Sequence, residues 1–369
     1  MSFEQFEDRR EAFIQKYVSS EPTHVGTDIK PWLVFDQRVL DRQAQQPEFA
    51  TPIWTYLERA CTEKRIMLGR QNLRKHAATL DRIEDRFGVD RYSLVAIWGI
   101  ESQYGQIRGD FSILSALATL AFCGRRQDFF EQELRGAIEI ITWHGLNAPL
   151  NGSWAGAFGH TQFMPSSYLD YAISLSGDTP PNLWDDNPSD ALASTAHYLA
   201  SHGWVSGQGW GARCHVPPEL DYALTGDHKI LSQKTLEQVD IPIPDHIKSE
   251  TYSLLAPAGA LGPFFAVTQN YHVLKRYNAS QAYVLAVGHL ADALKTGRIT
   301  RHFWPRHKAI TLEEIKHVQR QLTARGYSTQ GQDGIMGPNT VSAIRDYQRD
   351  FALEQDGYLS PELIQHILI

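Results

Sequence analysis

The sequence predicts an α+β protein that is mainly helical, with a small β-rich insertion and a C-terminal module of three short helices. Apolar residues recur at helical spacing through most of residues 1–202. Short β-branched runs separated by Gly and Pro replace that pattern at 205–270. Near the C-terminus, two Asp-Gly turns are each followed by a Pro suited to the first turn of a helix.

The helical part begins at the N-terminus. Residues 1–20 predict one amphipathic helix, and 62–88, which is rich in Arg, Lys, Leu and Ala, predicts a helical segment that closes at Gly88. Asp90 suits the N-cap of the next helix, which we expect to reach about Tyr104. Further helical segments are expected at 112–144, broken into two near Gly124, at 189–202, and again after 270.

Length and composition indicate several globular domains. The 369 residues suffice for roughly two to three domains, and the apolar content of 42% and charged content of 21% are ordinary for a globular chain. We expect a large first domain at 1–300, which contains the β-rich insertion at about 205–270. The polar stretch 301–308 is typical of an exposed linker, and 309–369 would form the C-terminal module.

Several function classes find no support. The net charge is −7 and no Lys/Arg block exceeds two residues, which argues against nucleic acid as a partner. Three Cys without a C-x-x-C pair disfavour a zinc ribbon or redox motif. No apolar run approaches the length of a transmembrane helix, and the acidic, polar start MSFEQFEDRR does not suit a signal peptide. Nine Trp and fifteen Tyr suit carbohydrate binding, although large cores use the same residues.

One carboxylate, Glu101, stands in the otherwise apolar run "AIWGIESQYGQIRG" at 96–109. On a helix that begins near Arg91, the side chains of Leu94, Trp98 and Glu101 share a face, so the acid should point into protein interior or a cleft. Apolar surroundings raise the pKa of a glutamic acid and keep it protonated for general-acid work near neutral pH. The structural alternative is a buried ion pair with one of three arginines, Arg108, Arg125 or Arg126.

A glycine-rich segment follows, "GSWAGAFGHTQFMPSSY" at 152–168, in which three glycines recur every three or four positions. The functional interpretation is a backbone that a ligand approaches closely, with Ser153 and Gln162 as hydrogen-bond donors. The alternative is a close-packed helix or turn within the fold; the segment is too short and polar to span a membrane.

Searches for other motifs give little. The chain has no H-E-x-x-H, Walker A or G-x-S-x-G motif, and "GQGWG" at 207–211 lacks the flanking strand and spacing of a dinucleotide loop. "SLSGDTPPNLWDD" at 174–186 places oxygen-bearing residues loosely as in a calcium loop, without the dense Asp ladder or the final Glu. We therefore expect no cofactor and no metal; the alternative is a degenerate calcium loop at 174–190.

The motifs together form an ordered set: "GIESQYG" with Glu101, "ILSALATLAF", "GRR", the glycine-rich segment, "NLWD", "HYLASHGW" and "KRYNASQAY". This set, spanning roughly residues 30–297, resembles the soluble lytic transglycosylase B family (glycoside hydrolase family 103), which cleaves peptidoglycan. The tail, with "VQRQLTARGY", "DGIMGPNT" and "AIRDYQ", is similar to a three-helix peptidoglycan-binding module. The resemblance implies a lysozyme-like catalytic core with a helical N-terminal subdomain in 1–300, and a peptidoglycan-binding domain at 309–369.

The resemblance also implies roles for individual residues. Glu101 matches the single catalytic acid/base, Ser153 matches a serine that holds the substrate near the acid, and Gln162 matches a glycan-contacting glutamine. The other matching substrate-binding positions are Tyr198, Tyr277, Asn278 and Tyr283, the basic pair Arg125 and Arg126 that meets the peptide stem or sugar, and Tyr56. The calcium-loop acids of the family are only partly kept, since Ser174 and Ser176 stand with Asp178 and two prolines follow.

The implied chemistry suits a lone acid. A hydrolysing glycosidase usually needs two carboxylates, whereas a lytic transglycosylase activates no water. Glu101 would protonate the oxygen between N-acetylmuramic acid and N-acetylglucosamine, then as a base take the proton of the muramoyl C6 hydroxyl, which closes a 1,6-anhydro ring. The implied partners are glycan strands and stem peptides, and the substrate implies a periplasmic location. Two alternatives stay open: a muramidase that adds water, since Asp110 and Asp170 are present, and a non-catalytic peptidoglycan-binding scaffold.

Overall fold

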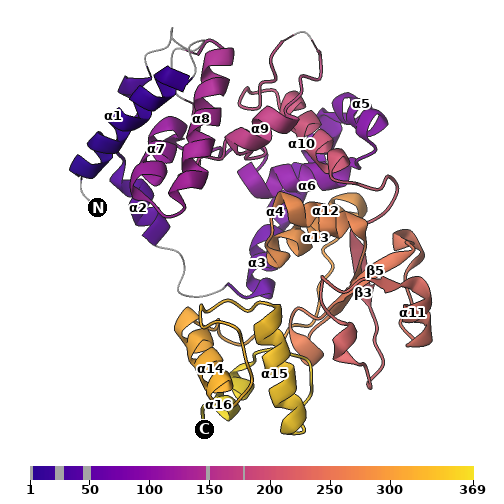
Figure 1. Ribbon diagram of the computed structural model, residues 1–369. Coiled ribbons are helices and arrows are strands. Elements are labelled where there is room, and N and C mark those ends of the chain that lie inside the picture. Colours follow the sequence, from indigo (N-terminus) through magenta and orange to yellow (C-terminus); the bar gives the residue numbers. More distant parts are fainter. Residues whose placement is uncertain (1–2, 21–28, 45–50, 147–149, 178) are drawn as a thin grey trace. The chain divides into compact units, whose positions relative to one another are not determined.

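Figure 1 shows the computed structural model, which describes residues 3–20, 29–44, 51–146, 150–177 and 179–369. The chain divides into two compact units: the first unit comprises Met1–Gln46 and Lys64–Ser201, and the second unit Pro47–Glu63 and His202–Ile369. Within the described ranges, no helix combines the length and the hydrophobicity that crossing a bilayer requires. The chain is mainly helical, which confirms the predicted fold class.

In the first unit, one group of helices surrounds α7. The group comprises α1 (Phe3–Ser20), α2 (Gln37–Ala44), α7 (Ile113–Cys123) and α8 (Gln127–Trp143), which lie together in Figure 1. Every residue of α7 is buried, so this helix needs apolar neighbours on all sides. Phe6 and Phe13 of α1 supply part of this packing, with ring centroids 5.4 and 5.6 Å from that of Phe122.

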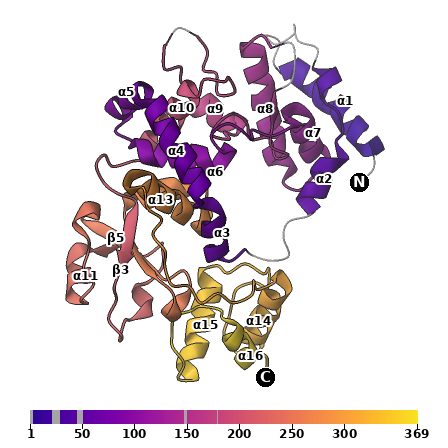
Figure 2. The same ribbon diagram turned by 180° about the vertical axis from the view of Figure 1, so that it is seen from behind.

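A second group in the first unit carries the predicted acid. It consists of α4 (Glu63–Lys75), α5 (Ala77–Phe87), α6 (Arg91–Ser102), α9 (Pro165–Tyr171) and α10 (Ser189–Ser201), seen from behind in Figure 2. The cap prediction for α6 is confirmed, because the Asp90 side chain accepts a hydrogen bond from the Ser93 N–H at 2.9 Å. The helix ends before Tyr104, the expected end, because Gln103 and Tyr104 both adopt positive φ.

The second unit contains the predicted β-rich region. Four antiparallel strands form a sheet in the order β3–β6–β5–β4, with α11 (Gln233–Gln238) directly after β4. The strands are β3 (Gly211–Cys214), β4 (Leu231–Ser232), β5 (Thr251–Leu255) and β6 (Phe264–Val267). Three helices lie before and after this region in the chain: α3 (Ile53–Ala60), α12 (Gln269–Tyr277) and α13 (Gln281–Thr296). Helix α13 packs against both α3 and α12.

The C-terminal module has the predicted three helices, α14 (Leu312–Ala324), α15 (Pro338–Asp350) and α16 (Pro361–Leu368). Its two Asp-Gly turns are built alike. Gln319 donates from Nε2 to Asp333 Oδ1 at 3.2 Å and accepts the Gly334 N–H at 2.8 Å. The second turn repeats this arrangement: Gln348 donates to Asp356 Oδ1 and accepts the Gly357 N–H, both at 2.8 Å. We call these two arrangements the Gln–Asp–Gly clamps.

The segment 301–308 differs from the expected exposed linker. Trp304 is only 6% exposed, and its ring centroid lies 6.1 Å from that of Trp54. The Nε2 atoms of His302 and His289 are hydrogen-bonded at 2.8 Å, and burial lowers the pKa of each to about 4. The expectation of exposure is therefore wrong for Trp304 and His302, because the surrounding polar and charged residues hid these anchors in the sequence.

Candidate active site

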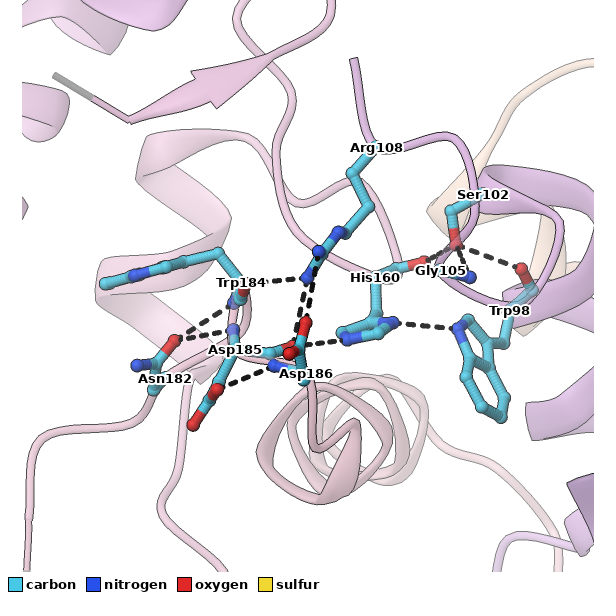
Figure 3. Close-up of polar contacts among 9 residues, drawn as sticks. All are labelled: Trp98, Ser102, Gly105, Arg108, His160, Asn182, Trp184, Asp185 and Asp186. Atoms are coloured by element: carbon cyan, nitrogen blue, oxygen red, sulfur yellow. Dashed lines mark hydrogen bonds and ion pairs between the residues drawn. The ribbon is translucent and has the colours of Figure 1, made fainter. Parts of the chain in front are cut away.

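The end of α6 is fastened to the glycine-rich segment beside Glu101. Ser102 Oγ donates to the carbonyl oxygen of His160 at 2.6 Å, and the Gly105 N–H donates to Ser102 Oγ at 2.9 Å (Figure 3). Ser102 is the residue directly after Glu101, so this contact fixes the backbone next to the predicted acid. Glu101 itself is partly buried.

His160 makes the second connection, on the other side of Glu101. Trp98 Nε1 donates to His160 Nδ1 at 3.0 Å, and His160 Nε2 lies 2.6 Å from the Asp185 carbonyl oxygen (Figure 3). An indole N–H can only donate, so Nδ1 must accept and the imidazole proton resides on Nε2, which donates to Asp185. Burial, the largest cause, lowers the pKa of His160, which favours this neutral form.

Glycines are required where these loops meet. Gly105 has φ +82°, and a Cβ there would lie 2.4 Å from His160 Cε1. A Cβ on Gly109 would lie 2.0 Å from the Gly152 carbonyl oxygen, next to the pairing of β1 (Phe111–Ser112) with β2 (Asn151–Gly152). Inside the glycine-rich segment, a Cβ added at Gly156 or Gly159 would likewise clash with protein atoms. Packing within the chain, the structural alternative, thus accounts for these glycines.

Arg108 connects a third segment to the loop after α6. Its Nη1 donates to the carbonyl oxygens of Trp184 at 2.7 Å and Asp185 at 3.0 Å, and its guanidinium forms an ion pair with Asp186 at 3.5 Å (Figure 3). Arg108, one of the three arginines considered as a partner of Glu101, thus holds the 184–186 turn. With the contacts of Ser102 and His160, it completes what we call the Trp98–His160 network.

The two polar residues predicted in the glycine-rich segment differ in which of their hydrogen-bonding atoms are already engaged within the chain. Gln162 donates from Nε2 to the carbonyl oxygens of Arg108 at 3.2 Å and Gly159 at 2.9 Å. Both amide hydrogens are thereby engaged, so the expected donor role is wrong and Oε1, an acceptor, is the atom left for a ligand. Ser153 Oγ accepts the Ala157 N–H at 3.0 Å, which leaves its hydroxyl hydrogen for donation.

The remaining predicted residues of the first unit lie on two other elements. Tyr198 of α10 is partly buried, and its ring centroid is 4.8 Å from that of Tyr171. Arg125 and Arg126 are exposed at the junction of α7 and α8. The Arg126 guanidinium lies 4.2 Å from the ring centroid of Phe129. Ser153 and Gln162 thus lie within the glycine-rich segment, whereas the arginine pair lies at a junction between two helices.

Four predicted residues belong to the second unit, and their roles stay predictions. Tyr56 lies in α3 and Tyr277 is the last residue of α12. Asn278 is exposed, and its side-chain oxygen accepts the Ser280 N–H at 3.1 Å, which shapes the turn between α12 and α13. Tyr283 in α13 is only 2% exposed.

Hydrogen bonds within the chain hold the segment 174–186, which the sequence compares loosely to a calcium loop. Asp190 accepts the Leu175 N–H on Oδ1 at 2.9 Å and the Asn182 N–H on Oδ2 at 3.0 Å. The hydroxyl oxygens of Ser174 and Ser176 bond each other at 3.0 Å. Asp178, the third expected contributor, lies outside the described residues.

Comparison with known proteins decides the family. Residues 9–292 match the family described as transglycosylase SLT domain, and residues 311–367 match the putative peptidoglycan binding domain. The chain belongs to the transglycosylase SLT family. This transglycosylase is 32% identical over 272 residues, 71% of its own chain and 74% of the relative, to membrane-bound lytic murein transglycosylase B of Escherichia coli K12.

Solved structures agree. SltB3 of Pseudomonas aeruginosa, solved in complex with NAG-anhNAM-pentapeptide, matches with a TM-score of 0.91 and 38% identity over 99% of each chain. Slt35 of Escherichia coli, solved in complex with calcium, matches with a TM-score of 0.67 and 30% identity over 79% of this chain and 94% of that one. The protein is therefore a lytic transglycosylase of peptidoglycan with a lysozyme-like core and a C-terminal peptidoglycan-binding domain, as the sequence predicted.

The Slt35 complex raises the question of calcium in this transglycosylase. Calcium prefers about six to eight oxygen ligands, several of them carboxylates. Here both oxygens of Asp190 already accept backbone N–H groups, and hydroxyls stand at positions 174 and 176. The described donors of this loop do not fit a calcium ion.

The sequence pattern pointed to Glu101 and missed the residues that hold the end of its helix. Trp98, Ser102, Arg108 and His160 form the network. The sequence indicates only two of them: Trp98 as a neighbour of Glu101 on the helix face, and Arg108 as an ion-pair partner of Glu101. The one available signal was His160, the single histidine of the glycine-rich segment. Nothing local indicates that it meets an indole N–H from a helix 62 residues earlier.

Proposed function

We propose that Glu101 is the single acid/base with which this transglycosylase cleaves the β-1,4 bond between N-acetylmuramic acid and N-acetylglucosamine. The observation that supports this role is the Trp98–His160 network. Trp98 and Ser102, three residues before and one residue after Glu101, are both hydrogen-bonded to His160. Holding the helix end on both sides restricts the position of the carboxyl group, and general acid catalysis requires such positioning.

The proposed reaction consumes no water. The carboxylic acid of Glu101 gives its proton to the glycosidic oxygen, the bond from that oxygen to muramoyl C1 breaks, and the N-acetylglucosamine side leaves as an alcohol. The substrate N-acetyl group, or an oxocarbenium ion, carries the positive charge at C1. The Glu101 carboxylate then takes the C6 hydroxyl proton while O6 bonds to C1, which closes the 1,6-anhydromuramoyl ring and restores the acid.

The substrate contacts follow from the hydrogen-bonding capacity of each residue. Ser153 has a hydroxyl hydrogen to donate and Gln162 has a carbonyl oxygen to accept, so the pair suits a sugar amide or hydroxyl. The exposed guanidinium groups of Arg125 and Arg126 suit stem carboxylates. We further propose that Tyr198, Tyr56, Tyr277, Asn278 and Tyr283 contact the glycan.

The domain boundaries follow the same proposal: a catalytic domain at 1–300, a connecting segment at 301–308 and a binding domain at 309–369. The binding domain would raise the local concentration of the enzyme on the wall by tethering. The SltB3 complexes, one with NAG-anhNAM-pentapeptide and one with NAG-NAM-pentapeptide, support a substrate that carries its stem peptide. Because peptidoglycan lies outside the cytoplasmic membrane, we propose a periplasmic location.

Product analysis tests this proposal against a hydrolytic muramidase. Asp110 and Asp170, the candidates for a second carboxylate, are both exposed, and neither belongs to the Trp98–His160 network. Purified sacculi are digested with the protein, and the muropeptides are analysed by mass spectrometry. We expect 1,6-anhydromuramoyl ends; muropeptides with reducing ends, heavier by one water, would contradict the proposal and favour hydrolysis.

A further inference from the structure

A cavity of about 690 Å³ lies within the second unit, where the start of α3, the loop after Thr225 and the C-terminal module meet. The second Asp-Gly turn, at Asp356 and Gly357, forms part of its wall. None of the residues assigned above to glycan cleavage or glycan contact lines it. The proposed contacts with the glycan therefore do not account for this cavity.

Arg345 of α15 is the unusual group in this wall. Its Nη2 donates to Thr225 Oγ1 at 2.7 Å, whereas its Nε is buried and has no hydrogen-bond partner. Among the described residues no carboxylate lies within ion-pair distance of this guanidinium. Burial lowers the pKa of Arg345, and the charges of Asp356 and Asp221 oppose that shift only in part. Such a cation is stabilised by an anionic ligand.

The carboxylates nearest in the cavity are already engaged. Asp356 accepts the Gln348 amide and the Tyr358 N–H on Oδ1, and the Ala260 N–H on Oδ2 at 2.9 Å. Asp227 is paired with Lys275. Lys229 adds a further positive charge to the wall. Three cationic side chains, Arg345, Lys229 and Lys275, thus line the cavity together with two carboxylates, Asp227 and Asp356, which leaves an excess of positive charge.

Part of the remaining wall is apolar. Ile53, Ile310, Ile315, Met336 and Val341 line it, supplied by α3, the module and the segment before it. A ligand that fits must carry carboxylates together with small apolar groups. Stem peptides have this composition, with free carboxylates and alanine methyl groups. The glycan strand does not, because its muramoyl carboxyl group is bonded to the stem as an amide.

We propose that this cavity binds the stem peptide of peptidoglycan, with a stem carboxylate paired to Arg345 and alanine side chains against the apolar wall. The inference rests on the proposed function for its ligand class and adds a peptide subsite apart from Glu101. It assigns the ligand surface of the C-terminal module to the face that carries the second Asp-Gly turn.

The test measures binding of a synthetic sugar-free stem pentapeptide to the full chain by isothermal titration calorimetry. Arg345→Gln removes the charge, and Arg349→Gln is the matched control, an exposed arginine one turn further along α15 and paired with Asp346 and Asp350. We expect Arg345→Gln to weaken binding at least tenfold, Arg345→Lys to weaken it less, and Arg349→Gln to stay within twofold. A chito-oligosaccharide without peptide should bind all four proteins equally.

Circular dichroism first checks that Arg345→Gln is folded. If Arg345→Gln does not fold, the affinity of Arg345→Lys for the pentapeptide is compared with that of the wild type instead. Wild-type affinity for the pentapeptide in folded Arg345→Gln would overturn the inference, as would equal loss in Arg349→Gln. Oligosaccharide binding that falls with the charge at 345 would also overturn it. The proposed function fails separately, if wild-type protein releases no anhydromuropeptides from sacculi, whatever the peptide affinity.

Discussion

The Trp98–His160 network and the Gln–Asp–Gly clamps both fix turns with buried polar groups, but they are built at different sequence distances. In the network, Trp98 reaches His160 over 62 residues, and Arg108 reaches Trp184 over 76. In the clamps, Gln319 reaches Asp333 over 14 residues, and Gln348 reaches Asp356 over 8. The first arrangement joins three segments once, and the second is local and occurs twice.

This difference separates what a binding module and a catalytic site need. A clamp rigidifies one turn, so a short repeated pattern suffices. A general acid must be held against groups from other parts of the chain, which only long-range contacts achieve. We therefore expect damage to the network to reduce catalysis, and damage to a clamp to reduce the stability of the module while the chemical step stays unchanged.

Among substitutions that disturb the network or the clamps, the largest effect is expected from Gly105→Ala. The new Cβ would lie 2.4 Å from His160 Cε1 in a left-handed backbone, so the imidazole must move and the Trp98 hydrogen bond breaks. We expect a loss of about 3 kcal/mol in unfolding free energy and on the order of a hundredfold in kcat. Gly145→Ala is the control, since Gly145 also has positive φ but nothing within 4 Å of a Cβ. Equal losses in both variants would contradict the packing argument.

Trp98→Phe should have the next largest effect. It removes the donor to His160 Nδ1 and leaves a buried acceptor unpaired, at a cost of about 1–3 kcal/mol. Urea denaturation and the rate of muropeptide release measure the two consequences. Trp143→Phe, at a 55% exposed position, should leave both unchanged. Unaltered cleavage by Trp98→Phe would show that His160 is held without the indole.

Gln319→Leu breaks the first clamp and should separate stability from catalysis. The Gly334 N–H loses its acceptor and Asp333 loses a donor, so we expect the module to be destabilised by about 1–2 kcal/mol. Cleavage of a short soluble muropeptide should stay at the wild-type rate. A fall in that rate would mean that the clamp also supports the reaction and that the proposed division is wrong.

The smallest effect is a difference in pH dependence. His160 is buried and its pKa is lowered, so its stabilising contribution is fully present above the ordinary histidine pKa of about 6.5. It is lost as the pH falls from there toward the lowered pKa, because the unfolded chain takes up a proton that the folded chain does not. Thermal unfolding at pH 7 and pH 5 should show a larger drop for wild type than for His160→Gln.

The buried His289–His302 pair is present in both of these proteins, so its titration cancels in the comparison. His160→Gln keeps an acceptor for Trp98 and a donor for Asp185, and it cannot titrate. Equal pH dependence in the two proteins would contradict a neutral, buried His160.

Much of the local structure was predictable from the residues themselves. Asp90 caps α6 as its side chain suggests, and the break near Gly124 separates α7 from α8. The two Asp-Gly turns and their following prolines predicted the module, because turn and cap preferences act over a few residues. The glutamines that complete the clamps were missed, since a buried Gln in a helix looks like a solvent-facing one in sequence.

The missed parts share one physical cause. Periodicity shows that Trp98 is buried but not which atom its N–H meets, and a polar stretch at 301–308 conceals the buried Trp304. The donor assigned to Gln162 failed for the same reason, because backbone carbonyls from two loops occupy its amide hydrogens. Such contacts depend on how distant segments fold together, and no single segment encodes them.

The rate at which Glu101→Gln releases 1,6-anhydromuropeptides from purified sacculi tests the central claim most directly. The substitution keeps the size of the side chain and removes the proton that the mechanism requires. Glu139→Gln, at an exposed position of α8, is the matched control. We expect Glu101→Gln to bind sacculi as wild type while its release rate falls at least a thousandfold, and Glu139→Gln to be unchanged. Wild-type release by Glu101→Gln would contradict the account.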